Sequence, residues 1–221
     1  DSSNCWSRDV VKHRRIGLIS MISGMPRPEQ MGHHTWRTCL ASLLLLITSA
    51  PAWAEWNVAA LMQQLARHPA GQARFTETKK LSVLDAPVVS SGRLIYSPPD
   101  RLEKITVQPK AESLTVESDQ VVVVRDGRRR EMRLQQVPEA LAIVEGVRGT
   151  LLGNEAMLRQ YYDLRLVGTE QDWRLALIPR EERLARWVRQ ITVNGQRHVV
   201  SSIETLQADG DSSIMRIEAE K

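Results

Sequence analysis

The sequence predicts a mainly β domain in which one large curved antiparallel sheet carries a few short helices. From residue 72 onward, apolar residues mostly recur at every second position, which is the period of a half-buried strand. Asp126-Gly127 and Asn194-Gly195 lie between apolar runs and are typical of two-residue hairpin turns, with Asp209-Gly210 as a weaker third. Helical periodicity is confined to a stretch near residue 60 and to residues 138–162.

Two segments at the start of the chain are excluded from this domain. Residues 1–30 are polar and basic without an apolar period, and we expect them to be an upstream extension outside the fold. Residues 31–54 have the parts of a secretory signal peptide, namely a basic Arg37, an apolar run and the cleavage pattern Ala52-Trp53-Ala54. The apolar run is far shorter than the ~20 residues of a membrane-spanning helix. We therefore expect an exported domain of residues 55–221 that is not an integral membrane protein.

Removing this leader changes what the composition implies. Six of the 30 basic residues and three of the 26 acidic residues precede Glu55, which leaves a net charge of +1. The pI of 9.3 therefore mostly reflects the leader, and nucleic-acid binding has no support. Both cysteines, Cys5 and Cys39, also lie in the leader, so no disulfide and no thiolate metal site is expected in the domain.

The domain is expected to begin with a helix and to continue as strands. Asn57 can cap a helix that carries Leu61 and Leu65 on one face and ends at His68-Pro69. Alternating or buried apolar residues then predict strands around residues 72–83, 92–97, 114–117, 121–124, 131–135, 162–166, 173–177, 191–193 and 199–203.

The segment from Pro138 to Tyr162 interrupts the strands with helical periodicity. Pro138 suits the first turn of one helix, and Asn154 can cap a second. Gly146, Gly149 and Gly153 are expected to break the segment into pieces. The segment is either a static crossover packed on the sheet or a lid over its concave side, and the periodicity alone favours the crossover.

Signatures of catalysis are almost absent, and we expect no enzyme, no cofactor and no metal site. The domain keeps two isolated histidines, His68 and His198, and lacks a G-x-S-x-G motif. Ser201 and Ser202 lie within a predicted strand rather than at a strained turn. Triad members can be far apart in sequence, so a lipid hydrolase or acyltransferase that uses His198 and a serine remains the alternative.

The cluster Arg125-Asp-Gly-Arg-Arg-Arg130 invites a functional interpretation. It could bind an anionic head group or an acidic partner. It also lies at a predicted hairpin tip, where charged side chains are expected to be solvated, and we favour that interpretation.

The remaining candidate site is the interior of the curved sheet, which is either an ordinary core or an apolar pocket. Strand alternation and the helical segment together predict its lining: Phe75, Leu94, Tyr96, Leu114, Val116, Leu134, Leu141, Val144, Leu151, Leu152, Leu164, Trp173, Leu175 and Leu177.

A set of short motifs occurs in a characteristic order: Gly92-Arg-Leu94, Pro98-Pro99, Leu102, Pro138-Glu-Ala-Leu141, Leu151-Leu152-Gly153, Tyr161 or Tyr162, Trp173-Arg-Leu-Ala-Leu-Ile-Pro179 and Gly210-Asp211. This order resembles the LolA-type outer-membrane lipoprotein carriers, and more closely their divergent LolA-related branch. The resemblance implies an incomplete β-barrel closed by short helices around a cavity for acyl chains, and we therefore expect residues 138–158 to form a lid over the mouth of that cavity. It further implies a periplasmic carrier that takes its cargo from an inner-membrane donor to an outer-membrane acceptor.

The sequence departs from this family at one position. LolA-type carriers have an arginine just before the proline of the Gly-x-Leu-x-x-x-x-Pro stretch, which is thought to hold the lid closed. Counting from Gly92 places Pro98 there, and proline has no side-chain donor. Arg101 lies close in sequence and is the candidate replacement.

Overall fold

The computed structural model describes residues 55–68 and 71–220. These residues form one compact unit. The expected upstream extension, the signal peptide and its cleavage site lie outside the described residues.

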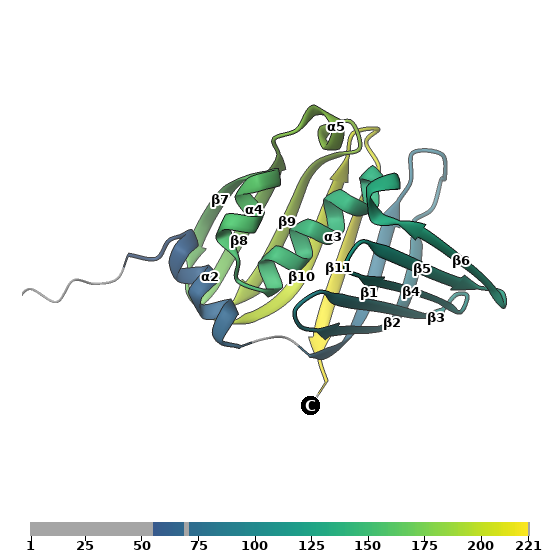
Figure 1. Cartoon of the computed structure of the whole chain (residues 1–221), viewed down its shortest axis with the longest axis horizontal. Helices are drawn as coiled ribbons and strands as arrows, with labels where there is room; N and C mark the ends of the chain where they lie inside the picture. The colour runs from purple at the N-terminus through teal and green to yellow at the C-terminus, as the bar shows by residue number, and fades with distance from the viewer. Residues whose placement is uncertain (1–54, 69–70, 221) are drawn as a thin grey trace, which may run out of the picture. The chain divides into compact units, whose positions relative to one another are not determined.

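Eleven antiparallel strands form one curved, unclosed sheet, in the order β6-β5-β4-β3-β2-β1-β11-β10-β9-β8-β7 (Figure 1). Because β1 pairs with β11, strands from the two ends of the domain meet in the middle of the sheet. The predicted fold class is confirmed. The strands are β1 (Gln72–Lys80), β2 (Val88–Ser97), β3 (Arg101–Gln108), β4 (Glu112–Glu117), β5 (Gln120–Arg125), β6 (Arg128–Arg133), β7 (Tyr162–Thr169), β8 (Asp172–Pro179), β9 (Val188–Gln196), β10 (Val199–Gln207) and β11 (Ser212–Ala219).

The expected turn at Asp126-Gly127 is confirmed, whereas the one at Asn194-Gly195 is wrong. Asp126 and Gly127 have φ of 51° and 72° and join β5 directly to β6. Gly195 instead lies inside β9, opposite Trp173 of β8, and the turn falls at Arg197-His198, where Arg197 has φ of 51°. A Cβ on Gly195 would lie 2.3 Å from Cζ2 of Trp173, so this glycine provides room for the indole rather than a turn.

Helices α2 (Val58–Arg67), α3 (Pro138–Leu151) and α4 (Glu155–Tyr161) form where they were expected, together with a 3-10 turn η2 (Leu134–Gln136) and a short α5 (Glu182–Ala185). The side chains of Asn57 and Asn154 cap α2 and α4 by accepting from the backbone N–H of Ala60 and Met157, both at 3.0 Å.

Only one of the three glycines in the predicted helical segment breaks it. Gly153 follows α3 with φ of 61°. Gly146 and Gly149 lie within α3, where a Cβ would come within 3.1 Å of Leu177 and 2.6 Å of Leu158, respectively. These two glycines therefore let α3 approach β8 and α4 closely, and the helix continues through them.

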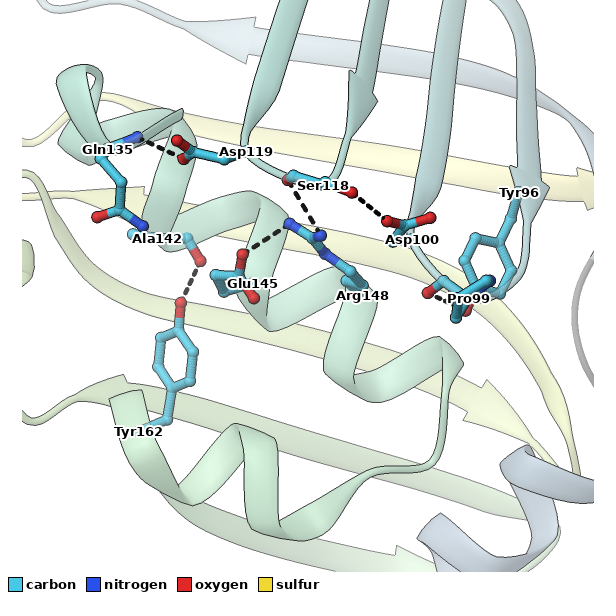
Figure 2. Close-up of polar contacts among 10 residues, drawn as sticks. All are labelled: Tyr96, Pro99, Asp100, Ser118, Asp119, Gln135, Ala142, Glu145, Arg148 and Tyr162. Carbon is cyan, nitrogen blue, oxygen red and sulfur yellow. Dashed lines mark hydrogen bonds and ion pairs between the residues drawn. The ribbon is translucent and has the colours of Figure 1, made fainter. Parts of the chain in front are cut away.

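Most of the core fills the space between the helices and the β7–β9 part of the sheet, over which α3 and α4 lie (Figure 1), and it extends to Val116 of β4 and Val121 of β5. Tyr162, Trp173 and Leu177 are fully buried in it. The hydroxyl of Tyr162 donates to the backbone carbonyl of Ala142 and so ties β7 to α3 (Figure 2). This half of the concave side is filled by side chains, so any cavity must lie elsewhere.

Candidate functional site

A cavity of about 1080 Å³ lies on the other side of α3. Its walls come from α2, α3, the strands β1 to β4, and the strands β10 and β11. It exceeds the ~300–1,000 Å³ that is usual for small-molecule sites, so it has room for a large ligand.

Apolar side chains make up most of the wall. Six of the fourteen predicted residues lie there: Leu94, Tyr96, Leu114, Val116, Val144 and Leu151. Further apolar lining was not predicted and comes from Leu65, Leu102, Ile143, Val147, Val200, Ile203, Met215 and Ile217. The alternation of Met215, Ile217 and Ala219 along β11 is a signal that could have identified that part of the wall.

The structure places the other predicted residues away from the cavity wall. Five of them are almost completely buried in the core: Leu134, Leu141, Trp173, Leu175 and Leu177. Leu164 is partly buried against that core, and Leu152 is half-buried at the end of α3. The cause is α3, which packs on Leu177 and Ile191 of the β8–β9 region at Gly146 while Ile143 and Val147 face the cavity.

Phe75 shares a strand face with the lining residues Ala73 and Glu77 but lies beneath charged groups. The ammonium of Lys104 sits 5.0 Å from the centre of its ring and forms an ion pair with Glu77. Lys79 lies 3.7 Å from the other oxygen of the same carboxylate. One part of the cavity wall therefore consists of the Lys104–Glu77 ion pair lying over the ring of Phe75. The alternation of apolar residues could not reveal this feature, because Lys104 interrupts that alternation in β3.

A polar contact joins α3 to the β4–β5 turn, as Figure 2 shows. Arg148 donates through Nη1 to the backbone carbonyl of Ser118 at 3.3 Å and through Nη2 to Glu145 at 2.6 Å. The hydroxyl of Ser118 in turn donates to Asp100 in the β2–β3 turn. Arg101, the candidate replacement for the family's arginine, instead pairs with Glu103 and Glu117 on the sheet, both at 2.9 Å.

Burial perturbs the ionisable groups around this contact. The pKa of Glu145 is raised by desolvation, an effect that the nearby Arg148 opposes. The pKa of Tyr162 is also raised, first by burial and then by the charge of Glu145. Burial also raises the pKa of Tyr96, which lines the cavity, against the opposing charge of Arg148, so this contact lies next to the cavity wall.

The two histidines lie together at one end of the cavity. Their rings stack with centroids 4.2 Å apart, and Nδ1 of His68 is 3.0 Å from the carbonyl of Gln64. Ser201 donates to the carbonyl of Asn194, and the hydroxyl of Ser202 accepts from the Asn194 amide. The predicted alternative of a His198–serine pair therefore finds no matching contact among residues 55–68 and 71–220.

The described part of the chain lacks two further features. No group of three or more His, Cys, Asp or Glu side chains there could hold a metal ion. Within the same residues, no helix has both the length and the apolar character needed to cross a membrane.

A comparison with protein-family models identifies one family over most of the chain. A family model described as outer membrane lipoprotein carrier protein LolA-like matches residues 50–217. No curated protein matches the sequence.

Solved structures with a similar fold include three bacterial proteins. A LolA superfamily protein of Nitrosomonas europaea is 8% identical with a TM-score of 0.43, covering 76% of this chain and 95% of its own. The Mycobacterium tuberculosis lipoprotein LppX is 13% identical with a TM-score of 0.41, and the match covers 73% of this chain and 93% of LppX. A putative outer membrane lipoprotein-sorting protein domain of Vibrio parahaemolyticus is 12% identical with a TM-score of 0.40, and the match covers 73% of this chain and 90% of that domain.

Proposed function

This chain belongs to the LolA-like family of outer membrane lipoprotein carrier proteins, and we propose that it is a non-catalytic periplasmic carrier that holds the acyl chains of a lipoprotein or another lipid in its cavity. Under this proposal the carrier receives its cargo from an inner-membrane donor and releases it to an outer-membrane acceptor.

The observation that supports this proposal best is the large, mostly apolar cavity. Burying an acyl chain stabilises it by roughly 0.8 kcal/mol per methylene relative to water, so free diffusion of a lipid between two membranes is very unfavourable. A protein that encloses the chains removes this barrier and needs no catalytic group. The apolar wall and the family membership support the same role.

Release of the cargo requires an opening, and the contact between α3 and the β4–β5 turn is the best candidate for it. We name the strands β3 to β6, residues 101–133, the wing. Arg148 of α3 donates to Ser118 in the wing, whereas Gly146 of the same helix packs on Leu177 and Ile191 in the opposite half of the sheet. Val116 and Val121 of the wing are also buried in the core, so opening must separate these apolar contacts as well as the polar one.

Binding of a fluorescent fatty acid to matched variants tests the carrier proposal. Ile203 lies on the cavity wall, whereas Leu206 of the same strand is 42% exposed and lies off that wall. Ile203→Asp places a charge against the acyl chain and should weaken binding by about tenfold or more, because an unpaired charge is costly in an apolar environment. Leu206→Asp should leave binding within about twofold, as is usual for a surface substitution.

Circular dichroism would first establish that both variants fold. Equal binding by the wild type and both variants would contradict the cavity as the binding site. Absence of any binding by the wild type would contradict the carrier proposal itself. Mass spectrometry of lipid that co-purifies with the protein would then identify the cargo.

A further inference from the structure

On the concave face of the wing, the side chains change from apolar near the β4–β5 turn to cationic toward the β5–β6 hairpin tip. Cross-strand partners in an antiparallel sheet share a face, so the strand register defines rows of side chains across β3, β4, β5 and β6. The row next to the β4–β5 turn is apolar and consists of Leu102, Val116, Val121 and Met132. This row lies at the end of the wing that contacts α3 through Ser118.

The following rows become charged toward the hairpin tips. The second row consists of Lys104, Leu114, Val123 and Arg130, and the third of Thr106, Glu112, Arg125 and Arg128. Lys104 and Leu114 line the cavity. Arg130 and Arg128 therefore lie on the cavity side of the edge strand β6, in rows that continue the cavity wall.

Charge pairing within these rows leaves two cations free. Lys104 pairs with Glu77, and Arg125 lies 3.6 Å from Glu112. Arg128 and Arg130 are exposed and form no ion pair with any residue in the described ranges. On the opposite face of β6, Arg129 pairs with Glu131 at 2.7 Å. The arginine cluster lies at the β5–β6 hairpin tip and is exposed, as predicted, and β6 divides its arginines between the two faces of the wing.

We propose that Arg128 and Arg130 bind the anionic head group, of the phosphate class, of an amphiphile whose acyl chain occupies the cavity. This inference rests on the proposed function. A chain lying over Leu114 and Val123 would bring its head to Arg130, two strands or roughly 10 Å further along the row. Guanidinium groups match phosphate oxygens in geometry and charge.

Acidic side chains elsewhere on the cavity wall do not oppose this arrangement. Glu139 accepts a hydrogen bond from Gln207, and Asp211 accepts one from the backbone N–H of Ser82 at 2.7 Å. Gln207, the partner of Glu139, belongs to β10, and Asp211 lies between β10 and β11, and neither strand is a neighbour of β6 in the sheet.

Calorimetric titration with two amphiphiles of equal chain length tests the inference. Below their micellar concentrations, dodecyl phosphate should bind the protein about fivefold more tightly than neutral dodecyl maltoside, as expected for exposed charge pairs. The double variant Arg128→Gln, Arg130→Gln should lose this preference while keeping its affinity for the maltoside. The matched control Arg129→Gln, Arg133→Gln removes the same charge from the opposite face of β6 and should keep the preference.

Three results would overturn the inference. They are equal affinities of the wild type for both amphiphiles, a preference that survives in the Arg128 and Arg130 variant, and an equal loss of preference in both double variants. Inorganic phosphate or an oligoglutamate peptide that binds as tightly as dodecyl phosphate would instead assign the arginines to a free anion or to a protein partner. If neither amphiphile binds, the proposed carrier function fails as well. Binding of the maltoside alone would leave the carrier function standing and contradict only the role of the two arginines.

Discussion

Glu145 and Arg148 place two charges in a buried part of α3, with side chains only 11% and 8% exposed. Their ion pair is close, yet Nε of Arg148 has no hydrogen-bond partner within the described residues. Removing both charges from water is costly, and close pairing offsets that cost only in part. The raised pKa of Glu145 shows that desolvation outweighs the attraction of Arg148.

This balance predicts how stability depends on pH. The pKa of Glu145 in the folded protein lies above its ordinary value of 4.5, so the folded state holds the proton over a window in which the unfolded chain has released it. The stabilisation is therefore present below that ordinary value and is lost as pH rises through the folded pKa. Urea unfolding should show that the stability of the wild type relative to Glu145→Gln falls as pH rises from about 4 toward neutrality. A relative stability that rises with pH would show that the ion pair dominates.

A second prediction concerns Gly195, where the sequence suggested a turn and the structure has a strand. Trp173 is held over this glycine by a 2.8 Å hydrogen bond from its indole N–H to the carbonyl of Arg197. Gly195→Ala would force the Cβ within 2.3 Å of the ring and 2.4 Å of the Val199 carbonyl oxygen. We expect a loss of about 1–3 kcal/mol in the free energy of unfolding.

Thermal or urea unfolding measures this loss. Gly71→Ala is the control, because a Cβ there meets nothing within 4 Å, and its effect should stay within about 0.5 kcal/mol. If the two variants are equally stable, the close packing of Trp173 on Gly195 is not as described. An Asn-Gly pair predicts a turn from local preference alone, and here a tertiary contact with Trp173 overrides that preference.

At the scale of elements, α3 has two faces with different roles. One face covers β8 and β9, and the other forms a wall of the cavity. Periodicity and Pro138 located this helix and its first turn, because these depend on residues near in sequence. Periodicity could not divide the apolar residues of the helix between core and cavity, because that division depends on which half of the sheet the helix contacts.

The same limit applies to the strands. β3 was not predicted, because Arg101, Glu103 and Lys104 obscure its apolar alternation. These charges are accommodated by pairing, Arg101 with Glu103 and Glu117, and Lys104 with Glu77 of β1. Pairing partners on other strands are set by register, which local sequence patterns do not specify. The charged part of the cavity wall was missed for this reason.

Hydrogen exchange should reveal which element moves to open the cavity. Because α3 packs on β8 and β9 and contacts the wing through Arg148, we expect the wing to open away from a stationary helix. Arg148→Gln should accelerate exchange at residues 113–124 of the wing while amides 173–177 of β8 stay protected. The double variant Glu145→Gln, Arg148→Gln should show the same acceleration as Arg148→Gln. Because this variant has no unpaired charge at residue 145, the acceleration would then come from loss of the contact with Ser118.

Binding of an acyl ligand should slow the same amides of the wing in the wild type. If exchange instead accelerates at residues 141–151 with the wing unchanged, then α3 itself is the moving lid that the sequence suggested. Equal protection of all three segments, unchanged by ligand, would require a different opening.

For the whole molecule, the proposed function requires that the domain is exported, and export depends on the predicted signal peptide. The domain's first helix begins at Val58 and is capped by Asn57 from within the domain. Its sheet is completed by β1 and β11. Cleavage after Ala54 would therefore leave every described helix and strand intact.

We expect the exported protein to begin at Glu55. Signal peptidase requires small residues at alternate positions before the cleaved bond, which Ala52 and Ala54 provide around Trp53. Ala54→Arg should therefore block processing, whereas Trp53→Arg, at the permissive position between them, should still be cleaved. N-terminal sequencing and intact mass of the protein recovered outside the cytoplasm measure both outcomes. A mature protein that begins upstream of Glu55, or equal processing of the two variants, would contradict the assigned site and with it the expected boundary of the carrier domain.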